Sequence, residues 1–366
     1  MGKVLNKLVR EGVKKRQVEN EWYDLRHMLS YANWAMFYIL LGGREVGKSY
    51  SITDFFCRQF KCKHIPFTWL RLTDRQAAKL LNNNAEKLVD PDLRRKYKLD
   101  LVTSGNNVYH VTKRTKPDKT GKTKILKKVL FARVYALSTF YNDKGSIFDK
   151  DFLNDPAMRY NIAIDEFQRE KGEKNTFDIL YALVNQLENL VRSTKDRVKI
   201  FFLGNTLEDA SDILCGFNFI PEKFGIFKLK SKRCVIENIE PSEAYLKRRK
   251  GTIADILLPE ASTFTNKINT DITVVSKERL LKPSLVIKFT KNKSDWFTVW
   301  NDNVIVKYKG EHKPVIAMRP YLDEVYIVEQ QRNVVLQFDT RAFKYRDLIT
   351  FKEFQKNIQL IKPRNS

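Results

Sequence analysis

The chain has 366 residues, enough for two domains, because single domains usually hold about 100 to 200 residues. Its 67 Lys and Arg exceed its 43 Asp and Glu, and the formal charge of +24 favours a polyanionic partner, nucleic acid before an anionic membrane surface. No apolar run approaches the ~20 residues that span a bilayer, which excludes a membrane-spanning protein and predicts a soluble one.

Residues 4–29 repeat apolar side chains at near-helical spacing, with Lys and Arg between them. This pattern predicts a basic amphipathic helix. Two interpretations remain open, a helix packed on the domain core with one solvated face, and a dedicated DNA-binding arm.

A Gly-rich loop follows the apolar residues 36–41 and fits the phosphate-binding pattern G-x-x-x-x-G-K-[ST]. In this pattern, backbone N–H groups surround the phosphates, Lys48 neutralises their oxygens, and Ser49 offers a hydroxyl to Mg²⁺ at a helix N-terminus. We therefore expect ATP with Mg²⁺ as cofactors. The expected nucleotide-binding residues are Gly42, Gly43, Arg44, Glu45, Val46, Gly47, Lys48, Ser49 and Tyr50.

The four cysteines are scattered and no secretory segment precedes them, so a reducing cytosol without disulfides is expected. Cys57, Cys62 and His64 lie close together in sequence, but no second pair has matching spacing, and no zinc site is predicted. Residues 65–72 are expected to form a strand. A short helix over 74–81 should follow, capped by Thr73 or Asp74.

Residues 111–128 contain many basic residues around Pro117 and Gly121, which predicts a hairpin with a basic tip. Such a hairpin suits contacts with DNA phosphates, which need charge without base-specific geometry. A solvated charged hairpin without a dedicated role is the alternative. The candidate DNA contacts are Lys113, Arg114, Lys116, Lys119, Lys122 and Lys124.

A second carboxylate motif follows the predicted buried strand 160–164, which ends in Asp165 and Glu166. This arrangement has the form of a Walker B element, in which Asp165 would hold Mg²⁺ and Glu166 would orient the attacking water. An ordinary surface turn is the alternative for an apolar strand that ends in two acids.

Residues 177–191 have a helical apolar pattern, and the predicted strand 198–203 runs into Asn205. A strand between the two motif-bearing strands would place Asn205 as a γ-phosphate sensor, although Gly-Asn is also a turn signal. The glutamate after Asp165 and the polar strand end favour an α/β P-loop NTPase of the additional-strand catalytic glutamate class, with a central, mostly parallel sheet.

Beyond these elements the composition changes. Residues 207–260 are expected to form a linker or connector, with a basic run at residues 247–250, after a P-loop domain spanning 1–206. Residues 261–366 contain strand-like pieces at 296–300, 304–308, 326–328 and 334–338, which predict a small α+β domain.

At this point the sequence resembles the genome-packaging ATPases of short-tailed bacteriophages of the phi-twenty-nine type, which are related to large terminase subunits. The resemblance covers most of the first 205 residues. It rests on residues 27–31, 42–49, 136–138, 165–170, 183–185, 191–192 and 203–205, and on Lys144.

The resemblance implies an ATP-driven motor that translocates double-stranded DNA into a preformed capsid. In such a motor the subunits form a homo-oligomeric ring, pentameric in that family, docked on the portal of the procapsid in the host cytoplasm. Arg192 falls at the position of the trans-acting arginine finger and Lys144 at that of a second basic residue, so both join Glu166 and Asn205 as catalytic candidates. A helix-terminal cation is the alternative for Arg192.

The resemblance also implies an RNase H-like C-terminal domain that has lost nuclease activity. Asp271, Asp302, Asp323 and Asp339 form no readable two-metal motif. Two alternatives remain, another DNA translocase or helicase-type ATPase, and a terminase with an active nuclease. Whether a structural RNA joins the assembly stays open.

Overall fold

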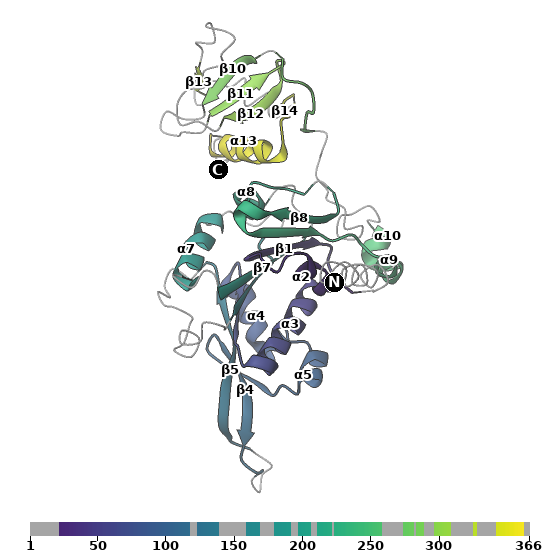
Figure 1. The fold of residues 1–366 in the computed structure, drawn as a ribbon, viewed down its shortest axis with the longest axis vertical. Helices are drawn as coiled ribbons and strands as arrows, with labels where there is room; N and C mark the ends of the chain where they lie inside the picture. The colour runs from purple at the N-terminus through teal and green to yellow at the C-terminus, as the bar shows by residue number, and fades with distance from the viewer. Residues whose placement is uncertain are drawn as a thin grey trace, which may run out of the picture. The chain divides into compact units, whose positions relative to one another are not determined.

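In the computed structural model the chain folds into two compact units (Figure 1), each with its own sheet. The first unit comprises Met1–Glu208 and Pro221–Asn269, and the second comprises Asp209–Ile220 and Thr270–Ser366. The structure describes residues 22–117, 123–138, 159–168, 179–191, 197–205, 211–221, 223–257, 274–281, 283–288, 296–308, 325–327 and 342–361.

A nine-stranded sheet forms the centre of the first unit. Its strands are β1 (Phe37–Gly42), β2 (Phe67–Arg71), β3 (Leu101–Ser104), β4 (Asn107–Arg114), β5 (Ile125–Ala136), β6 (Tyr160–Asp165), β7 (Val198–Asn205), β8 (Gly225–Leu229) and β9 (Cys234–Asn238). They lie in the order β3-β4-β5-β2-β6-β7-β1-β9-β8. The run from β5 to β9 is parallel, whereas β3–β4, β4–β5 and β8–β9 are antiparallel pairs. The expected α/β class with a mostly parallel sheet is confirmed.

The central strands are buried because they are continuous apolar runs, as parallel strands covered on both faces require. Every residue of β6 is buried, and so is β1 from its second residue onward. Helix α3 (Lys48–Lys63) packs its aromatic side chains on this sheet. The ring of Phe56 lies 4.8 Å from that of Phe67 in β2, and the ring of Phe60 lies 4.9 Å from that of Phe131 in β5.

The remaining helices of the first unit are short. They are α2 (Arg26–Tyr31), α4 (Asp74–Ala85), α5 (Pro91–Tyr97), α7 (Ile179–Val191), α9 (Glu243–Arg249) and α10 (Ile253–Leu257), with a 3-10 turn at Lys230–Lys232. The expected cap of α4 is confirmed, because the Thr73 hydroxyl accepts a hydrogen bond from the Gln76 N–H and the Gln76 side chain accepts one from the Thr73 N–H. Of the N-terminal helix expected over residues 4–29, residues 4–21 lie outside the described part.

Strands β4 and β5 form the expected hairpin, which extends beyond the helices of the first unit in Figure 1. Residues 207–260 differ from the expected connector. Strands β8 and β9 within that segment join the large sheet, and β9 pairs in parallel with β1. The reason is that the apolar side chains of Val235 and Ile236 are fully buried beside β1.

The second unit contains a five-stranded sheet in the order β13-β10-β11-β12-β14. Its elements are α8 (Asp212–Gly216), β10 (Pro283–Lys288), β11 (Trp296–Trp300), β12 (Val304–Tyr308), β13 (Val325–Ile327), β14 (Lys344–Tyr345) and α13 (Leu348–Ile361). The expected strands 296–300 and 304–308 are confirmed, and the expected strand 334–338 lies outside the described part. The core of this unit forms where Phe354 of α13 meets Phe297 of β11, with ring centroids 5.2 Å apart.

The cysteines of the chain are free thiols, with Cys57 and Cys234 buried. Among the described helices, none combines the length and the apolar composition needed to cross a bilayer.

Candidate active site

The Gly-rich loop (residues 42–49) connects the end of β1 to the start of α3. Lys48 is only 7% exposed and folds back over the loop, where its Nζ donates hydrogen bonds of 2.7 Å to the carbonyl oxygens of both Gly42 and Gly43. Glu45 and Gly47 have φ angles of +62° and +97°, and Gly47 caps α3. The backbone therefore turns through left-handed positions that leave its amides available to an anion.

Residues 22–25 support this loop from outside the sheet. The Tyr23 N–H donates to the Val46 carbonyl at 2.8 Å, and a Cβ on Gly47 would lie 3.2 Å from Cε3 of Trp22. The Tyr23 hydroxyl donates to the carboxylate of Glu237 in β9 at 2.7 Å, which anchors the segment to the sheet. A side chain at position 47 is disfavoured both by this tight contact and by the positive φ.

Three parallel neighbouring strands, β6, β7 and β1, bring polar side chains to one edge of the sheet. The carboxyl ends of parallel strands meet at the same edge, where open α/β sheets bind ligands. In register, Gly42 pairs with Asn205 and Asp165 pairs with Leu203. The expected position of β7 between the other two strands is confirmed. The Lys48 Nζ lies 3.4 Å from Oδ1 of Asn205.

Arg71 is a member of this site that sequence reasoning missed. It ends β2, the parallel neighbour of β6 on the side opposite β7. Its Nη2 lies 2.9 Å from Oδ2 of Asp165 and its Nη1 lies 2.5 Å from Oε2 of Glu166. One guanidinium thus balances two carboxylates. A polar residue at the end of the predicted strand 65–72 was the available signal, but only the strand order shows which neighbour it meets.

Burial and charge perturb the titration of this cluster. Burial lowers the pKa of Lys48 to about 8, because desolvation disfavours the ammonium more than the charges of Asp165 and Glu166 favour it. Burial also raises the pKa of Asp165, and the positive charge of Arg71 opposes that rise. A buried cation and a buried carboxyl with opposed perturbations are typical of functional sites.

Glu166 is placed differently from Asp165. Its side chain is 47% exposed, whereas that of Asp165 is 8% exposed, so Glu166 can reach solvent water. Its φ of +52° lies in the left-handed region, which costs a non-glycine residue about 1 kcal/mol. The next residue, Phe167, is buried against Gly204 of β7, where an added Cβ would approach the ring to 2.8 Å. This packing holds the strained turn in place.

The donor set suits a magnesium ion. Ser49 and Asp165 carry the hard oxygen atoms that such an ion would need, and Mg²⁺ typically takes one or two protein oxygens together with substrate phosphates and water. Within the described ranges no three His, Cys, Asp or Glu side chains cluster as a metal site.

An open cavity of about 1070 Å³ borders the start of α3. It is lined by aromatic side chains, including Trp22, Tyr50 and Tyr97, which offer flat faces for stacking a planar ring. Acidic side chains, among them Asp54 and Asp92, also line it.

Other predicted residues are exposed to solvent. The side chains of Ser49 and Tyr50 are exposed at the start of α3, and Arg44 is exposed in the loop. On the hairpin, Lys113, Arg114, Lys116 and Lys124 are exposed, and Arg114 pairs with Asp100 at 2.7 Å. Four predicted site residues lie outside the described part, namely Lys119, Lys122, Lys144 and Arg192. The same holds for three of the four acidic residues considered in the C-terminal segment, Asp271, Asp323 and Asp339.

The fold and this edge cluster define an α/β protein with a large, mostly parallel sheet and a Gly-rich loop beside two carboxylates that share one arginine. Two solved structures share the fold over nearly the whole chain. One is the bacteriophage Phi-29 viral genome packaging motor assembly, with a TM-score of 0.62 and 19% identity over 94% of this chain and 100% of that chain. The other is the Phi-28 gp11 DNA packaging motor, with a TM-score of 0.58 and 15% identity over 95% of this chain and 100% of that chain.

No family model matches the sequence, and no curated protein matches it. The resemblance to phage packaging motors stated from the sequence is thus confirmed in the fold.

Proposed function

We propose that the chain binds ATP with Mg²⁺ at the Gly-rich loop and hydrolyses it. The observation that carries this proposal is the meeting of Lys48, Asp165 and Glu166 at the carboxyl edge of the sheet, with Arg71 paired to both acids. The P-loop NTPase class of the additional-strand type is part of the proposal, and the position of β7 between β6 and β1 supports it.

Each residue has a defined role in this mechanism. The loop amides and Lys48 would bind the phosphates, and Ser49 and Asp165 would hold the Mg²⁺. The ion supplies electrostatic stabilisation of the charge that develops on the phosphoryl oxygens. Glu166 accepts a hydrogen bond from the attacking water and orients it. Asn205 lies within reach of Lys48 and would donate to the γ-phosphate.

Arg192 and Lys144 complete the proposed site from a neighbouring subunit. A guanidinium beside the γ-phosphate stabilises transition-state charge and contributes about 10³-fold or more in rate. Both residues lie outside the described part, so their roles rest on the sequence resemblance.

We further propose that hydrolysis drives double-stranded DNA into a preformed capsid. The shared fold with two phage packaging motor chains supports this, as does the net charge of +24. The proposed assembly is a pentameric homo-oligomeric ring, docked on the procapsid portal in the host cytoplasm, with a structural RNA as a further partner to be tested. The second unit is proposed as an RNase H-like docking domain without nuclease activity. The strand β13, parallel beside the antiparallel strands β10–β12, supports the RNase H-like part of that assignment.

The test is an ATPase assay of the full chain alone, with double-stranded DNA, and with DNA plus empty procapsids. We expect turnover to rise at each step, and Glu166→Gln to lower turnover by about 100-fold or more while ATP still binds. Glu240→Gln, an exposed carboxylate elsewhere in the first unit, is the matched control and should behave as the parent does.

Normal turnover in Glu166→Gln would remove that residue from its role. Stimulation by DNA with duplex unwinding and no response to procapsids would favour a helicase-type ATPase instead. DNA cleavage in the presence of Mn²⁺ would indicate a terminase with an active nuclease.

A further inference from the structure

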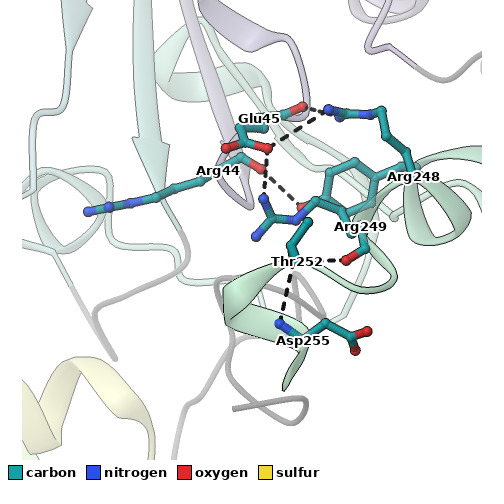
Figure 2. Close-up of polar contacts among 7 residues, drawn as sticks. Arg44, Glu45, Arg248, Arg249, Thr252 and Asp255 are labelled. Atoms are coloured by element: carbon teal, nitrogen blue, oxygen red, sulfur yellow. Dashed lines mark hydrogen bonds and ion pairs between the residues drawn. The ribbon is translucent and has the colours of Figure 1, made fainter. Parts of the chain in front are cut away.

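Helix α9 contacts the Gly-rich loop although some 200 residues separate the two in sequence. The Tyr245 hydroxyl donates a hydrogen bond to the carbonyl oxygen of Arg44 at 3.0 Å. Nη2 of Arg248 donates to the carbonyl oxygen of Glu45 at 2.7 Å. Figure 2 shows the side chains of α9 converging on this part of the loop. Two successive loop carbonyls are therefore bound by one helix.

The orientation of the loop amides follows from these contacts. A trans peptide bond points its C=O and its N–H in opposite directions. Because α9 holds the carbonyls of Arg44 and Glu45, the N–H groups of Glu45 and Val46 are directed away from α9. The Val46 carbonyl accepts a hydrogen bond from the Tyr23 N–H. The Gly47 N–H, on the same peptide bond, is therefore directed away from Tyr23. Successive N–H groups with fixed directions form an anion-binding concavity.

The conformation of Glu45 needs this support. Its φ of +62° is unfavourable for a residue with a Cβ. Nη1 of Arg249 lies 2.7 Å from its carboxylate, and the Arg249 side chain is buried whereas that of Glu45 is exposed, so the buried partner fixes the position of the pair. The guanidinium of Arg248 also stacks on Trp22, with 3.9 Å between its Cζ and the ring centroid. The side chain and the backbone of Glu45 are thus both bound by α9.

The end of α9 is anchored as well, as Figure 2 shows. The Thr252 hydroxyl donates to the Arg249 carbonyl at 2.8 Å and accepts from the Asp255 N–H at 3.4 Å. By contrast, Lys247 and Lys250 of the same basic run are exposed. The run that sequence alone assigns to a connector therefore contains two kinds of residue, arginines that bind the loop and lysines that face solvent.

We propose that Tyr245 and Arg248 are positioning residues for the triphosphate: by holding the carbonyls of Arg44 and Glu45, they preorganise the loop amides that bind the β- and γ-phosphates. Arg249 assists by holding Glu45 in its left-handed conformation. This inference rests on the proposed ATP binding at the loop. It assigns α9 to recognition of the phosphate chain rather than of the base.

The experiment measures ATP, ADP and AMP affinity by calorimetry for the full chain and its variants. Tyr245→Phe, which keeps the ring, should weaken ATP and ADP binding about fivefold through the loss of one hydrogen bond. Arg248→Met, which keeps the apolar stem, should weaken both by about tenfold because it removes a charge-assisted bond. AMP, which lacks these phosphates, should change by less than about twofold in either variant.

Controls separate positioning from general damage. Lys247→Met in α9 and Lys250→Met directly after it remove the same charge from exposed positions and should leave all three affinities unchanged. Arg248→Lys should recover part of the ATP affinity, since an ammonium can still donate one hydrogen bond. The thermal midpoint of unfolding is measured for each variant without nucleotide. The variants that lose affinity should have the same midpoint as the parent.

Equal losses for AMP and ATP, or ATP affinities equal to the parent in both variants, would overturn the inference. In the second case, loss of ATP binding in Lys48→Ala would leave the proposed function intact. If the parent chain itself binds no ATP, the proposed function and this inference both fail.

Discussion

Lys48 is a buried cation held between two loop carbonyls and the carboxylates at the sheet edge. Its pKa of about 8 lies below the ordinary value of 10.5, since burial disfavours the ammonium. Between these two pH values the unfolded chain binds more protons at this residue than the folded chain. The contribution of Lys48 to the free energy of unfolding therefore rises with pH across that window, because the cost of a buried charge is removed.

ATP binding should depend on pH in the opposite direction. Phosphate oxygens favour the charged ammonium, so the nucleotide-free protein must take up a proton at Lys48 when ATP binds above pH 8. We expect ATP affinity to fall about tenfold from pH 7 to pH 9. Calorimetry in buffers of different ionisation enthalpy should report uptake of about one proton at pH 9. An affinity that stays flat to pH 9, or no difference in pH dependence between the parent and Lys48→Met, would contradict this assignment.

At the scale of elements, the β4–β5 hairpin concentrates positive charge without enough acids to balance it. Lys113 and Lys127 are direct partners across the two strands, and both are exposed. Like charges directly opposite each other destabilise an antiparallel pair. Lys128 is placed over the ring of Tyr109 at 4.1 Å, and Arg114 pairs with Asp100. A polyanion bound at Lys113 and Lys127 would relieve the repulsion between these two positive charges.

The double variant Lys113→Gln and Lys127→Gln tests whether the hairpin contacts DNA. If both lysines contact phosphates, the slope of log affinity for double-stranded DNA against log salt should decrease by about 1.8, or about 0.9 for each contact. The double variant Lys79→Gln and Lys87→Gln removes the same charge from exposed positions on and after α4, and should change the slope less. Equal slopes in the two double variants would assign the hairpin to the solvated alternative.

At the scale of the whole molecule, the two units are interleaved along the chain. Asp209–Ile220 belongs to the second unit although the first unit continues at Pro221. This segment contains α8, where Ile213 and Leu214 are buried. Burial raises the pKa of Cys215 in α8 to about 12, and the nearby carboxylates of Asp212 and Glu353 add to the rise, which places α8 close to α13.

A truncation tests this division of the chain. A protein ending at residue 269 keeps α8 but loses the rest of its unit, so Ile213 and Leu214 should become exposed and the protein should aggregate. A second truncation that also replaces residues 209–220 with a Gly-Ser linker should stay monodisperse in light scattering and retain ATP binding. The outcome against this division would be that the chain ending at residue 269 is also monodisperse and has the same thermal midpoint as the linker variant. In that case α8 would not need the rest of the second unit for its burial.

Local elements could be predicted from the sequence because their causes lie within a few residues. The apolar runs before Gly42, Asp165 and Asn205 are strands because each is long enough to be buried on both faces, and Thr73 caps α4 through a residue three positions away. The Gly-rich loop could also be predicted, because its pattern lies within eight consecutive residues, 42–49.

Contacts across the sheet could not be predicted in this way. Arg71 meets Asp165 only because β2 lies beside β6, and β9 joins the sheet only because β1 has an open side. Neither fact has a local sequence signal, because strand order is set by packing and by the closure of long connections. The basic run of α9 was assigned to a connector since nothing near it indicates the loop that it binds.

The sequence by itself determined the chemistry available to this protein, namely a loop of amides with one lysine, and strands that end in carboxylate and amide side chains. The tertiary structure decided which of these groups act together, through the strand order that brings Arg71 to the two acids and through the helix that fixes the loop carbonyls. The physical reason is the distance along the chain over which each interaction acts. Backbone conformation and capping depend on near neighbours in the chain, whereas burial, pKa and the direction of a loop amide depend on segments that only folding brings together.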